Sequence, residues 1–379
     1  MGILDKYKGS LVGGAVGDAL GYTVEFLNER QIFEKYGENG ITEYTLHNGK
    51  ALISDDTQMT MFTATALLDA ITRGKLRGIM GNLSQYIAFE YQGWYLTQIQ
   101  NFPVNIDNNY ANYSWIMNDP NIFERRAPGN TCLSALASGK FGTIEKPINN
   151  SKGCGGIMRV APIGLYFSNF NMHGQRNMEI EKIDRLGAEA AAITHGHELG
   201  YIPAAALVHI ITLVSHNKSC SLEDAVFDSV KTMRLMFSHC REFKYFAELI
   251  DLAVSLSKSG GNDLENIHRL GEGWVAEETL AIAIYCALKY QNDFEKAICT
   301  AVNHRGDSDS TGAVCGNILG AFLGYEAIPK KFINDLEFHD ELITLANDLY
   351  NDCQMTEYGS NIDKTWLEKY CYKTYKLEA

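Results

Sequence analysis

Residues 9–21 read GSLVGGAVGDALG, and residues 312–320 read GAVCGNILG. Both stretches have glycine at every fourth position, at Gly9, Gly13, Gly17 and Gly21 and at Gly312, Gly316 and Gly320. Residues four apart share one face of a helix. Glycine inside a helix costs up to about 1 kcal/mol relative to alanine, so such a row indicates that a neighbouring backbone approaches closely. The two rows predict a pair of tightly packed core helices, beginning near residues 9 and 311.

Helical periodicity also dominates the rest of the chain. Small or apolar residues recur at three- and four-residue spacing in 57–72, 186–194, 203–215, 222–237, 244–257, 275–290 and 294–303. Pro203 suits the first position of its helix. Only 41–47 alternates in the way that strands do. We predict an all-α protein with one compact domain.

The boundaries of this domain follow from composition. We expect it to cover 1–350, followed by a C-terminal extension over 351–379. Within it, 96–126 is rich in asparagine and aromatic residues and contains Pro103 and Pro120, which predicts a variable surface insertion. Such an insertion is either a binding loop or a disordered segment, and the sequence leaves both readings open.

The overall composition limits the classes of partner. The 379 residues carry 33 Lys and Arg against 46 Asp and Glu, a formal charge of −13, which disfavours broad binding to nucleic acid. The nine cysteines contain no C-x-x-C pair, and the start of the chain has no signal-like apolar stretch. No apolar run reaches the roughly 20 residues of a membrane helix. We predict a cytoplasmic protein with reduced thiols and with no nucleic-acid or membrane partner.

Two acidic motifs precede predicted helices. The first is SDDT at 54–57, and the second is GDSDST at 306–311. Carboxylates at a helix start can simply cap it, but this explains only one of each pair comfortably. Hydroxyl and carboxylate oxygens suit Mg²⁺, Mn²⁺ or Ca²⁺ and not zinc, and the spacing of an EF-hand is absent. If the motifs face each other, they can hold a pair of cations that serve hydrolysis.

Glycine-rich turns and histidines are further candidates. The segment 152–159, KGCGGIMR, can present backbone N–H groups to a diphosphate, and 129–131, GNT, is a similar turn into a helix. Turns of this kind are commonly no more than turns. His195 and His197 lack the additional ligands that a zinc site needs. His304, near the second acidic motif, is as well explained by a satisfied interior position as by catalysis.

Together these motifs resemble the ADP-ribosylglycohydrolase family. The resemblance runs in order through GSLVGGAVGDALGYTVEF (9–26), SDDTQMTMFTA (54–64), YQGWY (91–95), APGNTCLSAL (127–136), KGCGGIMRVAPIGL (152–165), ITHGHELGYIPAAAL (193–207), GEGWVAEETLAIAIYCAL (271–288) and HRGDSDSTGAVCGNILGAFLGYEAIP (304–329). It implies an all-helical single domain that cleaves ADP-ribose from a side chain at a centre of two Mg²⁺ ions, or of Mn²⁺.

The resemblance also implies roles for individual residues. It implies metal ligands at Ser54, Asp55, Asp56, Asp307, Asp309 and Ser310. It implies ligand-binding positions at Gly129, Asn130, Thr131, Gly153, Cys154, Gly155, Gly156, Ile157, Met158, His195 and Trp274. Glu25 matches a glutamate beside the metal centre and is implied as a ligand or a base.

One departure points to a branch of the family. The nitrogenase-regulating branch has an acid two residues before the GNT turn, where this chain has Ala127. The stretch RAPGNTC, 126–132, instead looks like ADP-ribosylarginine hydrolases. We therefore expect the catalytic carboxylate to be Glu25, Asp55 or Asp56, and the substrate to be an ADP-ribosylated protein, modified at arginine.

Two alternatives belong to other functional classes. One is a non-catalytic member of the family that binds ADP-ribose or serves structurally, and the intact set of motif oxygens argues against it. The other is an immunity protein that neutralises a cognate ADP-ribosyltransferase toxin, on which the sequence is silent.

Overall fold

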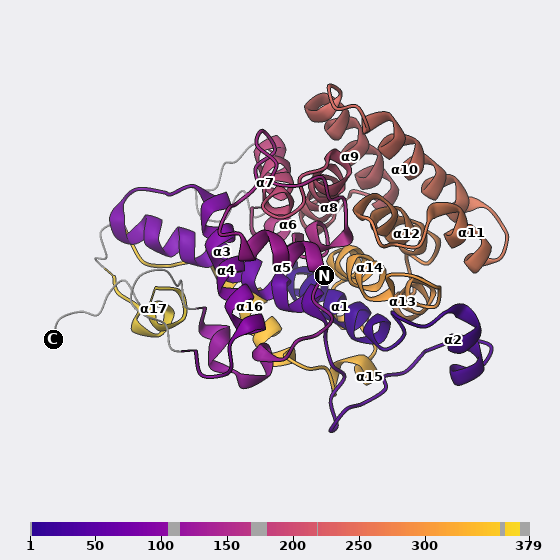
Figure 1. The fold of residues 1–379 in the computed structure, drawn as a ribbon, viewed down its shortest axis with the longest axis horizontal. Coiled ribbons are helices and arrows are strands. Elements are labelled where there is room, and N and C mark those ends of the chain that lie inside the picture. Colours follow the sequence, from indigo (N-terminus) through magenta and orange to yellow (C-terminus); the bar gives the residue numbers. More distant parts are fainter. Residues whose placement is uncertain (1, 105–113, 168–179, 218, 357–360, 372–379) are drawn as a thin grey trace.

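The computed structural model describes residues 2–104, 114–167, 180–217, 219–356 and 361–371, and this part of the chain is helical (Figure 1). The α-helices are α1 (Ile3–Tyr22), α2 (Glu29–Tyr36), α3 (Asp55–Arg77), α4 (Leu83–Ile99), α5 (Asn130–Ala137), α6 (Ala161–Phe167), α7 (Ile180–Ala192), α8 (Glu198–His216), α9 (Leu222–Phe237), α10 (Phe243–Lys258), α11 (Asp263–Leu270), α12 (Ala276–Lys289), α13 (Phe294–Val302), α14 (Ser308–Leu323), α15 (Lys330–Ile333), α16 (His339–Asn351) and α17 (Lys364–Tyr370). Short 3-10 helices are η1 (Trp115–Asn118), η2 (Pro120–Phe123), η3 (Cys154–Gly156) and η4 (Tyr325–Ala327). The all-α prediction is confirmed.

Helices α1 and α14 lie side by side in the middle of the molecule (Figure 1). Their glycine rows face each other in antiparallel register, so that Gly13 meets Gly316 and Gly17 meets Gly312. A Cβ added at Gly13 would lie 2.6 Å from the carbonyl oxygen of Gly316, closer than any real side chain could lie. The predicted close packing of these two helices is confirmed. We call the contact between the two glycine rows the glycine seam.

The register of the seam positions the acidic motifs. Because the helices are antiparallel, the end of α1 at Gly21 meets the start of α14 at Ser308. Near the start of α1, between Gly9 and Gly13, Ser10 hydrogen-bonds reciprocally with Asn317, each donating from its side chain to the backbone oxygen of the other, at 3.0 and 2.9 Å. The backbone contact therefore fixes how far along α1 the second acidic motif lies.

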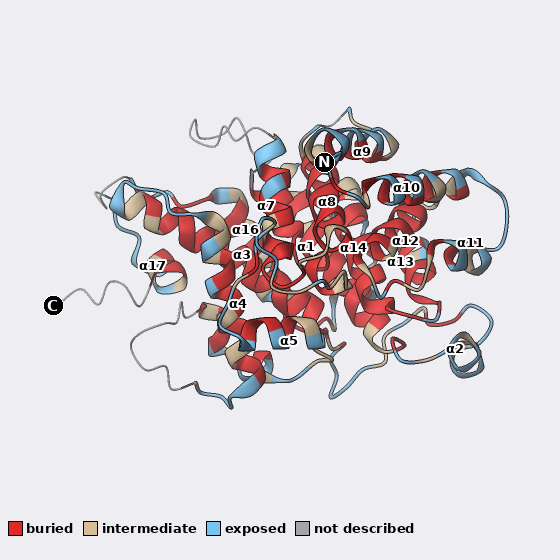
Figure 2. Ribbon diagram, turned by 45° about the horizontal axis from the view of Figure 1, so that its top comes forward, coloured by how far each residue is buried: buried red, intermediate tan, exposed pale blue. Residues whose placement is uncertain are grey.

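The other helices enclose this pair. Helices α3, α4, α16 and α17 lie toward one end of the molecule, and α9 to α12 lie toward the other (Figure 1). Buried residues concentrate on α1, α3, α8 and α14 in the centre (Figure 2). Helix α8 alone, among the helices of the described residues, has the length and apolar composition of a membrane span, but 89% of its apolar window is buried within the molecule. Such burial is typical of a core helix.

Two local expectations were wrong. Residues 41–47 form no strand, since His47 makes only an isolated bridge with Lys50 across a tight turn. Pro203 does not start its helix, because α8 begins at Glu198, where His197 caps it by accepting from the N–H of Leu199. Buried contacts outweigh the missing N–H of this proline, which itself is buried.

The predicted insertion at 96–126 is only partly a surface excursion. Residues 105–113 of it lie outside the described residues. Its last part forms η1 and η2, and Ile116, Met117 and Ile122 there belong to the hydrophobic core. The composition of 96–126 did not reveal this, because its three buried apolar residues are outnumbered by polar ones. In the predicted C-terminal extension, Trp366 of α17 donates from Nε1 to Thr72 of α3 at 2.8 Å, so α17 packs on the domain.

Candidate functional site

The first acidic motif forms the start of α3. Ser54 is the N-cap residue, and its hydroxyl oxygen accepts from the N–H of Asp56 at 3.2 Å. A buried carboxylate of α1, Asp18, accepts from the backbone N–H groups of Ser54 and Thr57 at 2.9 and 3.0 Å. Asp18 thereby satisfies N–H groups that every helix start leaves without a partner and ties α3 to α1. The side chains of Asp55 and Asp56 are left to face outward from this anchored turn.

The second acidic motif forms the start of α14 and faces the first. Asp307 caps the helix by accepting from the N–H of Ser310 at 3.2 Å. The hydroxyl of Ser310 donates to Asp56 Oδ1 at 2.8 Å, although the two residues are 254 positions apart. The expectation that the two oxygen-rich helix starts lie opposite each other is therefore met. Their two positive helix-dipole ends both point at the carboxylates.

Glu25 lies beside this cluster in the turn that follows α1. Its side chain is buried, and its Oε2 has no hydrogen-bond partner in the structure. Burial raises the pKa of Glu25 to about 10, and the negative charges of Asp309, Asp307, Asp55 and Asp18 add to this. A buried carboxylate oxygen without a donor is costly, so this position calls for a proton or a bound cation.

The same two causes act on the rest of the cluster. Burial first, and the charge of Asp309 second, raise the pKa of Asp18 to about 7. Burial and the charge of Asp309 also raise the pKa values of Asp55, Asp56 and Asp307 well above their ordinary values. The pKa of Asp309 itself is raised by burial. Within the described part of the chain, none of these carboxylates forms an ion pair. The site therefore gathers buried carboxyl groups that no positive side chain of the described residues neutralises, and without a cation their raised pKa values favour the protonated form.

The residues fit divalent cations in the nature of their donor atoms. Hard oxygen donors, several of them anionic, are the ligands that Mg²⁺ and Mn²⁺ prefer. Among the described residues, no three carboxylate, imidazole or thiol groups already converge as a finished coordination site. Two of the predicted ligands, Asp56 and Asp307, each accept a hydrogen bond from another side chain. Ser310 donates to the first, and the Cys154 thiol donates to the second with Sγ 2.7 Å from Oδ2.

The turn at 129–131 lies against the acidic cluster. Gly129 precedes α5, and its N–H donates to Asp55 Oδ2 at 3.3 Å. Asn130 and Thr131 form the first turn of α5, and the Thr131 hydroxyl lies 3.1 Å from that of Ser151. The first N–H groups of a helix are open to an anion. The structure thus brings this predicted ligand-binding turn next to the acidic motif.

The segment 153–158 forms η3 and lies over His195. Its Cys154 N–H donates to the carbonyl of Trp274 at 3.2 Å, and the N–H groups of Ile157 and Met158 donate back to the carbonyl of Cys154. Ile157 and Met158 are core residues. These three N–H groups already donate within the protein. The backbone N–H groups of Gly155 and Gly156 are therefore the ones we consider for binding a diphosphate.

His195 supports this segment from below. It is buried, its Nδ1 lies 2.8 Å from the Thr194 hydroxyl, and a Cβ added at Gly155 would lie 3.0 Å from its ring. Burial and, to a smaller extent, the positive charge of Arg159 lower the pKa of His195 to about 3. His195 is thus a neutral imidazole at physiological pH and does not supply positive charge to the diphosphate.

Trp274 contacts Phe26, the residue that follows Glu25 in the chain. Its ring stacks on Phe26, with centroids 6.4 Å apart and an interplanar angle of 26°. Both rings are unusually exposed, at 41% for Trp274 and 71% for Phe26. The pair offers a flat apolar face beside the acidic cluster.

Sequence reasoning missed two residues that organise the site. Asp18 anchors α3, and the signal for it was a lone carboxylate inside the glycine-rich core helix. Arg159 is fully buried, donates to the Thr194 hydroxyl at 2.7 Å, and lies 4.1 Å over the ring of Tyr91. A buried arginine needs such partners, so an arginine directly after the Gly-rich segment was the available signal.

Comparisons with known proteins give a consistent family. A family model described as ADP-ribosylglycohydrolase matches residues 1–359. ADP-ribosylhydrolase ARH3 of Homo sapiens is 26% identical over 220 residues, which are 53% of this chain and 58% of that protein. ADP-ribosylarginine hydrolase Tri1 of Serratia proteamaculans is 24% identical over 358 residues, which are 92% of this chain and 79% of that protein.

A solved structure has the same fold. It belongs to an ADP-ribosylglycohydrolase-related protein complex and superimposes with a TM-score of 0.62. The match covers 92% of this chain and 98% of the other, at 23% sequence identity. At this identity the similarity supports the shared fold alone.

Proposed function

The chain belongs to the ADP-ribosylglycohydrolase family, which removes ADP-ribose from modified substrates, and from this premise we propose that it is a metal-dependent hydrolase acting on ADP-ribosylated arginine in proteins. Such an activity reverses mono-ADP-ribosylation. The observation that carries the proposal is the contact between the two acidic helix starts, in which Ser310 and Asp56 meet at 2.8 Å amid carboxylates without ion-pair partners. A protein with only a structural role would gain nothing from burying so many carboxyl groups together.

The metal part of the proposal rests on the donor atoms. We assign two Mg²⁺ ions, or Mn²⁺ in their place, to the oxygens of Ser54, Asp55, Asp56, Asp307, Asp309 and Ser310. Such ions orient substrate oxygens and lower the pKa of a bound water. The chain itself contributes the fixed spacing of the two helix starts, which the glycine seam sets.

Cleavage of an N-glycosidic bond also requires proton transfer. As the bond between the ribose carbon and the guanidine nitrogen breaks, the departing nitrogen takes up a proton and water supplies the new oxygen. Glu25 is our candidate for this transfer because it is buried beside the cluster and has an oxygen without a partner. Proton transfer by a carboxyl group is common in glycoside hydrolysis.

Three observations support the arginine linkage. Tri1, which is similar over most of this chain, is named as an ADP-ribosylarginine hydrolase. Ala127 replaces the acid of the nitrogenase-regulating branch. The stacked rings of Phe26 and Trp274 offer the flat aromatic surface that a planar, cationic guanidine favours.

Hydrolysis of modified peptides tests the proposal. We expect release of ADP-ribose from peptides modified at arginine, at a rate at least about tenfold above that for serine or cysteine adducts, and loss of this activity after removal of divalent ions with EDTA. Asp307→Ala and Asp309→Ala should each lower kcat by about a thousandfold or more, because each leaves a cation without a charged ligand. Asp251→Ala, an exposed residue of α10, is the control and should be as active as the wild type.

Three results would contradict parts of the proposal. Equal rates on serine and arginine peptides would refute the linkage. Full activity in EDTA would refute the metal requirement. An inert protein that still binds ADP-ribose would indicate the non-catalytic alternative.

A further inference from the structure

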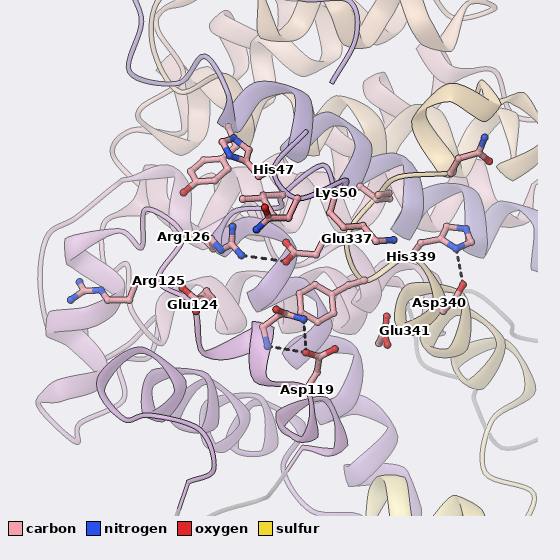
Figure 3. Close-up of a pocket in the computed structure, with 17 residues that line it drawn as sticks. His47, Lys50, Asp119, Glu124, Arg125, Arg126, Glu337, His339, Asp340 and Glu341 are labelled. Atoms are coloured by element: carbon pink, nitrogen blue, oxygen red, sulfur yellow. Dashed lines mark hydrogen bonds and ion pairs between the residues drawn. The ribbon is translucent and has the colours of Figure 1, made fainter. Parts of the chain in front are cut away.

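A large polar cavity lies outside the predicted ligand site. It has a volume of about 820 Å³ and is lined by residues within 47–52, 119–126 and 334–341, together with Tyr22 (Figure 3). None of the predicted catalytic, metal-binding or ligand-binding residues lines it. One of its walls is the last part of the 96–126 insertion, through Asp119, Asn121, Glu124, Arg125 and Arg126. The last part of the 96–126 insertion, which lies outside the motifs that resemble the family, thus forms one wall of the cavity.

The cavity shares a wall with the acidic cluster. The backbone carbonyl of Arg126, a lining residue, accepts from the N–H of Asp55 at 3.1 Å. Tyr22, also a lining residue, ends α1 beside Glu25, and burial together with the charges of Asp18, Glu25 and Asp309 raises its pKa despite the opposing charge of Arg126. A chain lying in the cavity would therefore run close to the carboxylates without occupying the predicted ADP-ribose site.

The charges in the cavity favour a cationic occupant. Arg126 points at Glu337 and pairs with it at 3.3 Å, whereas Arg125 points away from them (Figure 3). Asp340 lies 2.9 Å from His339 Nδ1, so with both of these contacts set aside Asp119, Glu124 and Glu341 remain against Lys50 and Arg125. Excess carboxylate repels phosphate and attracts lysine or arginine side chains.

The backbone around the cavity is strained. The left-handed region is uncommon for residues other than glycine. Phe338 lines the cavity with a φ value of 56°, and Ala127, with φ 52°, directly follows the lining residue Arg126. Such strain collects at binding and catalytic sites, where the surrounding structure enforces it.

We propose that this cavity binds the polypeptide of the modified protein next to its ADP-ribosylated side chain, and that it selects segments with lysine or arginine around that side chain. The inference rests on the proposed function, because it names the protein part of that substrate. It explains why the insertion has buried apolar residues, which hold its last part rigidly against the domain.

The binding test uses full-length protein and two unmodified fluorescent peptides. One has two lysines on each side of a central arginine, and the other has glutamates there. We expect fluorescence anisotropy to give a Kd at least about fivefold lower for the lysine peptide. Glu124→Gln combined with Glu341→Gln should weaken its binding about fivefold, whereas Lys50→Gln should tighten it about twofold. Glu43→Gln combined with Glu368→Gln, two exposed carboxylates outside the cavity, is the matched control and should bind as the wild type does.

The kinetic test uses arginine-modified substrates. In the Glu124→Gln/Glu341→Gln protein, KM should rise about fivefold for the modified lysine peptide and stay unchanged for free ADP-ribosylarginine, which does not reach the cavity. Absence of hydrolysis of either substrate refutes the proposed function, and the anisotropy result then decides the cavity by itself. Preference for the glutamate peptide, equal affinity of wild type and double variant, or competition by inorganic phosphate would each overturn the inference.

Discussion

The two ends of the α1–α14 pair differ in how their backbones and side chains are used. Along the glycine seam, from Gly9 to Gly17, the helices touch through backbone atoms, and the side chains of Ser10 and Asn317 each donate to the backbone oxygen of the other residue. Just past the seam, Asp309 and Glu25 bring like charges together, and one oxygen of Glu25 has no partner. The first region is closely packed through uncharged groups, although the Oδ1 of Asn317 there has no hydrogen-bond partner, whereas the second region gathers buried carboxyl groups.

This difference shows how the fold maintains an unfavourable site. The carboxylates raise one another's pKa values and would separate if the helices could slide or tilt. Backbone contact at three successive turns leaves little room for such movement, because at Gly9, Gly13 and Gly17 a Cβ would already overlap the backbone of α14. The close packing of α1 against α14 is thus what keeps the carboxylates of the cluster together.

The largest expected effect comes from filling the seam. Gly316→Leu places a branched side chain where even a Cβ would overlap the backbone of Gly13, and we expect a loss of more than about 3 kcal/mol of unfolding free energy, or failure to fold. Thermal unfolding followed by circular dichroism measures this. Gly260→Leu is the control, since nothing lies within 4 Å of a Cβ there. An unchanged melting temperature in the Gly316 variant would show that the seam does not hold the helices.

The second prediction has the opposite sign. Asp309→Asn removes the charge that repels the other carboxylates while keeping an oxygen to accept from the Ser310 N–H, now at 2.9 Å. In EDTA we expect the free energy of unfolding to rise by about 1 to 2 kcal/mol, although activity is lost. Mg²⁺ should raise the melting temperature of the wild type but not of the variant, because ligand binding stabilises only a protein that binds it. Equal Mg²⁺ stabilisation of both proteins would contradict a role of Asp309 in the metal site.

The smallest expected effect concerns Asp184, a buried carboxylate that faces a histidine. Asp184 lies 2.7 Å from His209 Nδ1, and Asp228 lies 3.2 Å from Nε2. Burial lowers the pKa of His209, but its hydrogen bonds and the charges of Asp184 and Asp228 outweigh this and raise the pKa above 6.5. The stabilisation by this pair is complete below pH 6.5 and is lost as the pH rises through the folded-state pKa.

Asp184→Asn tests this compensation. The substitution should cost about 1 kcal/mol more unfolding free energy at pH 6 than at pH 8, as measured by urea denaturation. An exposed control, Asp251→Asn, should show no such dependence on pH. A larger cost at pH 8 would mean that His209 is neutral in the folded protein.

The sequence was sufficient for features that repeat locally. Glycines four apart predicted α1 and α14, and the two acidic motifs were recognisable as helix starts. What it lacked were the contacts between distant segments. Asp18 is significant because it accepts from the backbone of Ser54, 36 positions away. No local pattern reveals such a partner.

The insertion shows the same limit. Its polar composition predicted a surface excursion, whereas Ile116 and Met117 are buried in the core. The cavity beside it depends on residues near 50, 120 and 340 meeting in space, and no spacing in the sequence relates them. The identity of the cations, the arginine linkage, a cognate transferase and the cytoplasmic location stay predictions.

The antiparallel seam also has a consequence for biosynthesis. Helix α1 leaves the ribosome first, but its partner α14 begins about 300 residues later, at Ser308. At roughly 5 to 20 residues per second, α1 waits about 15 to 60 s for its partner. During that time its small apolar face is open to chaperones or to misassembly. The acidic cluster is completed only with the last fifth of the chain, so a nascent chain that ends before α14 lacks Asp309 and Ser310, two of the predicted metal ligands.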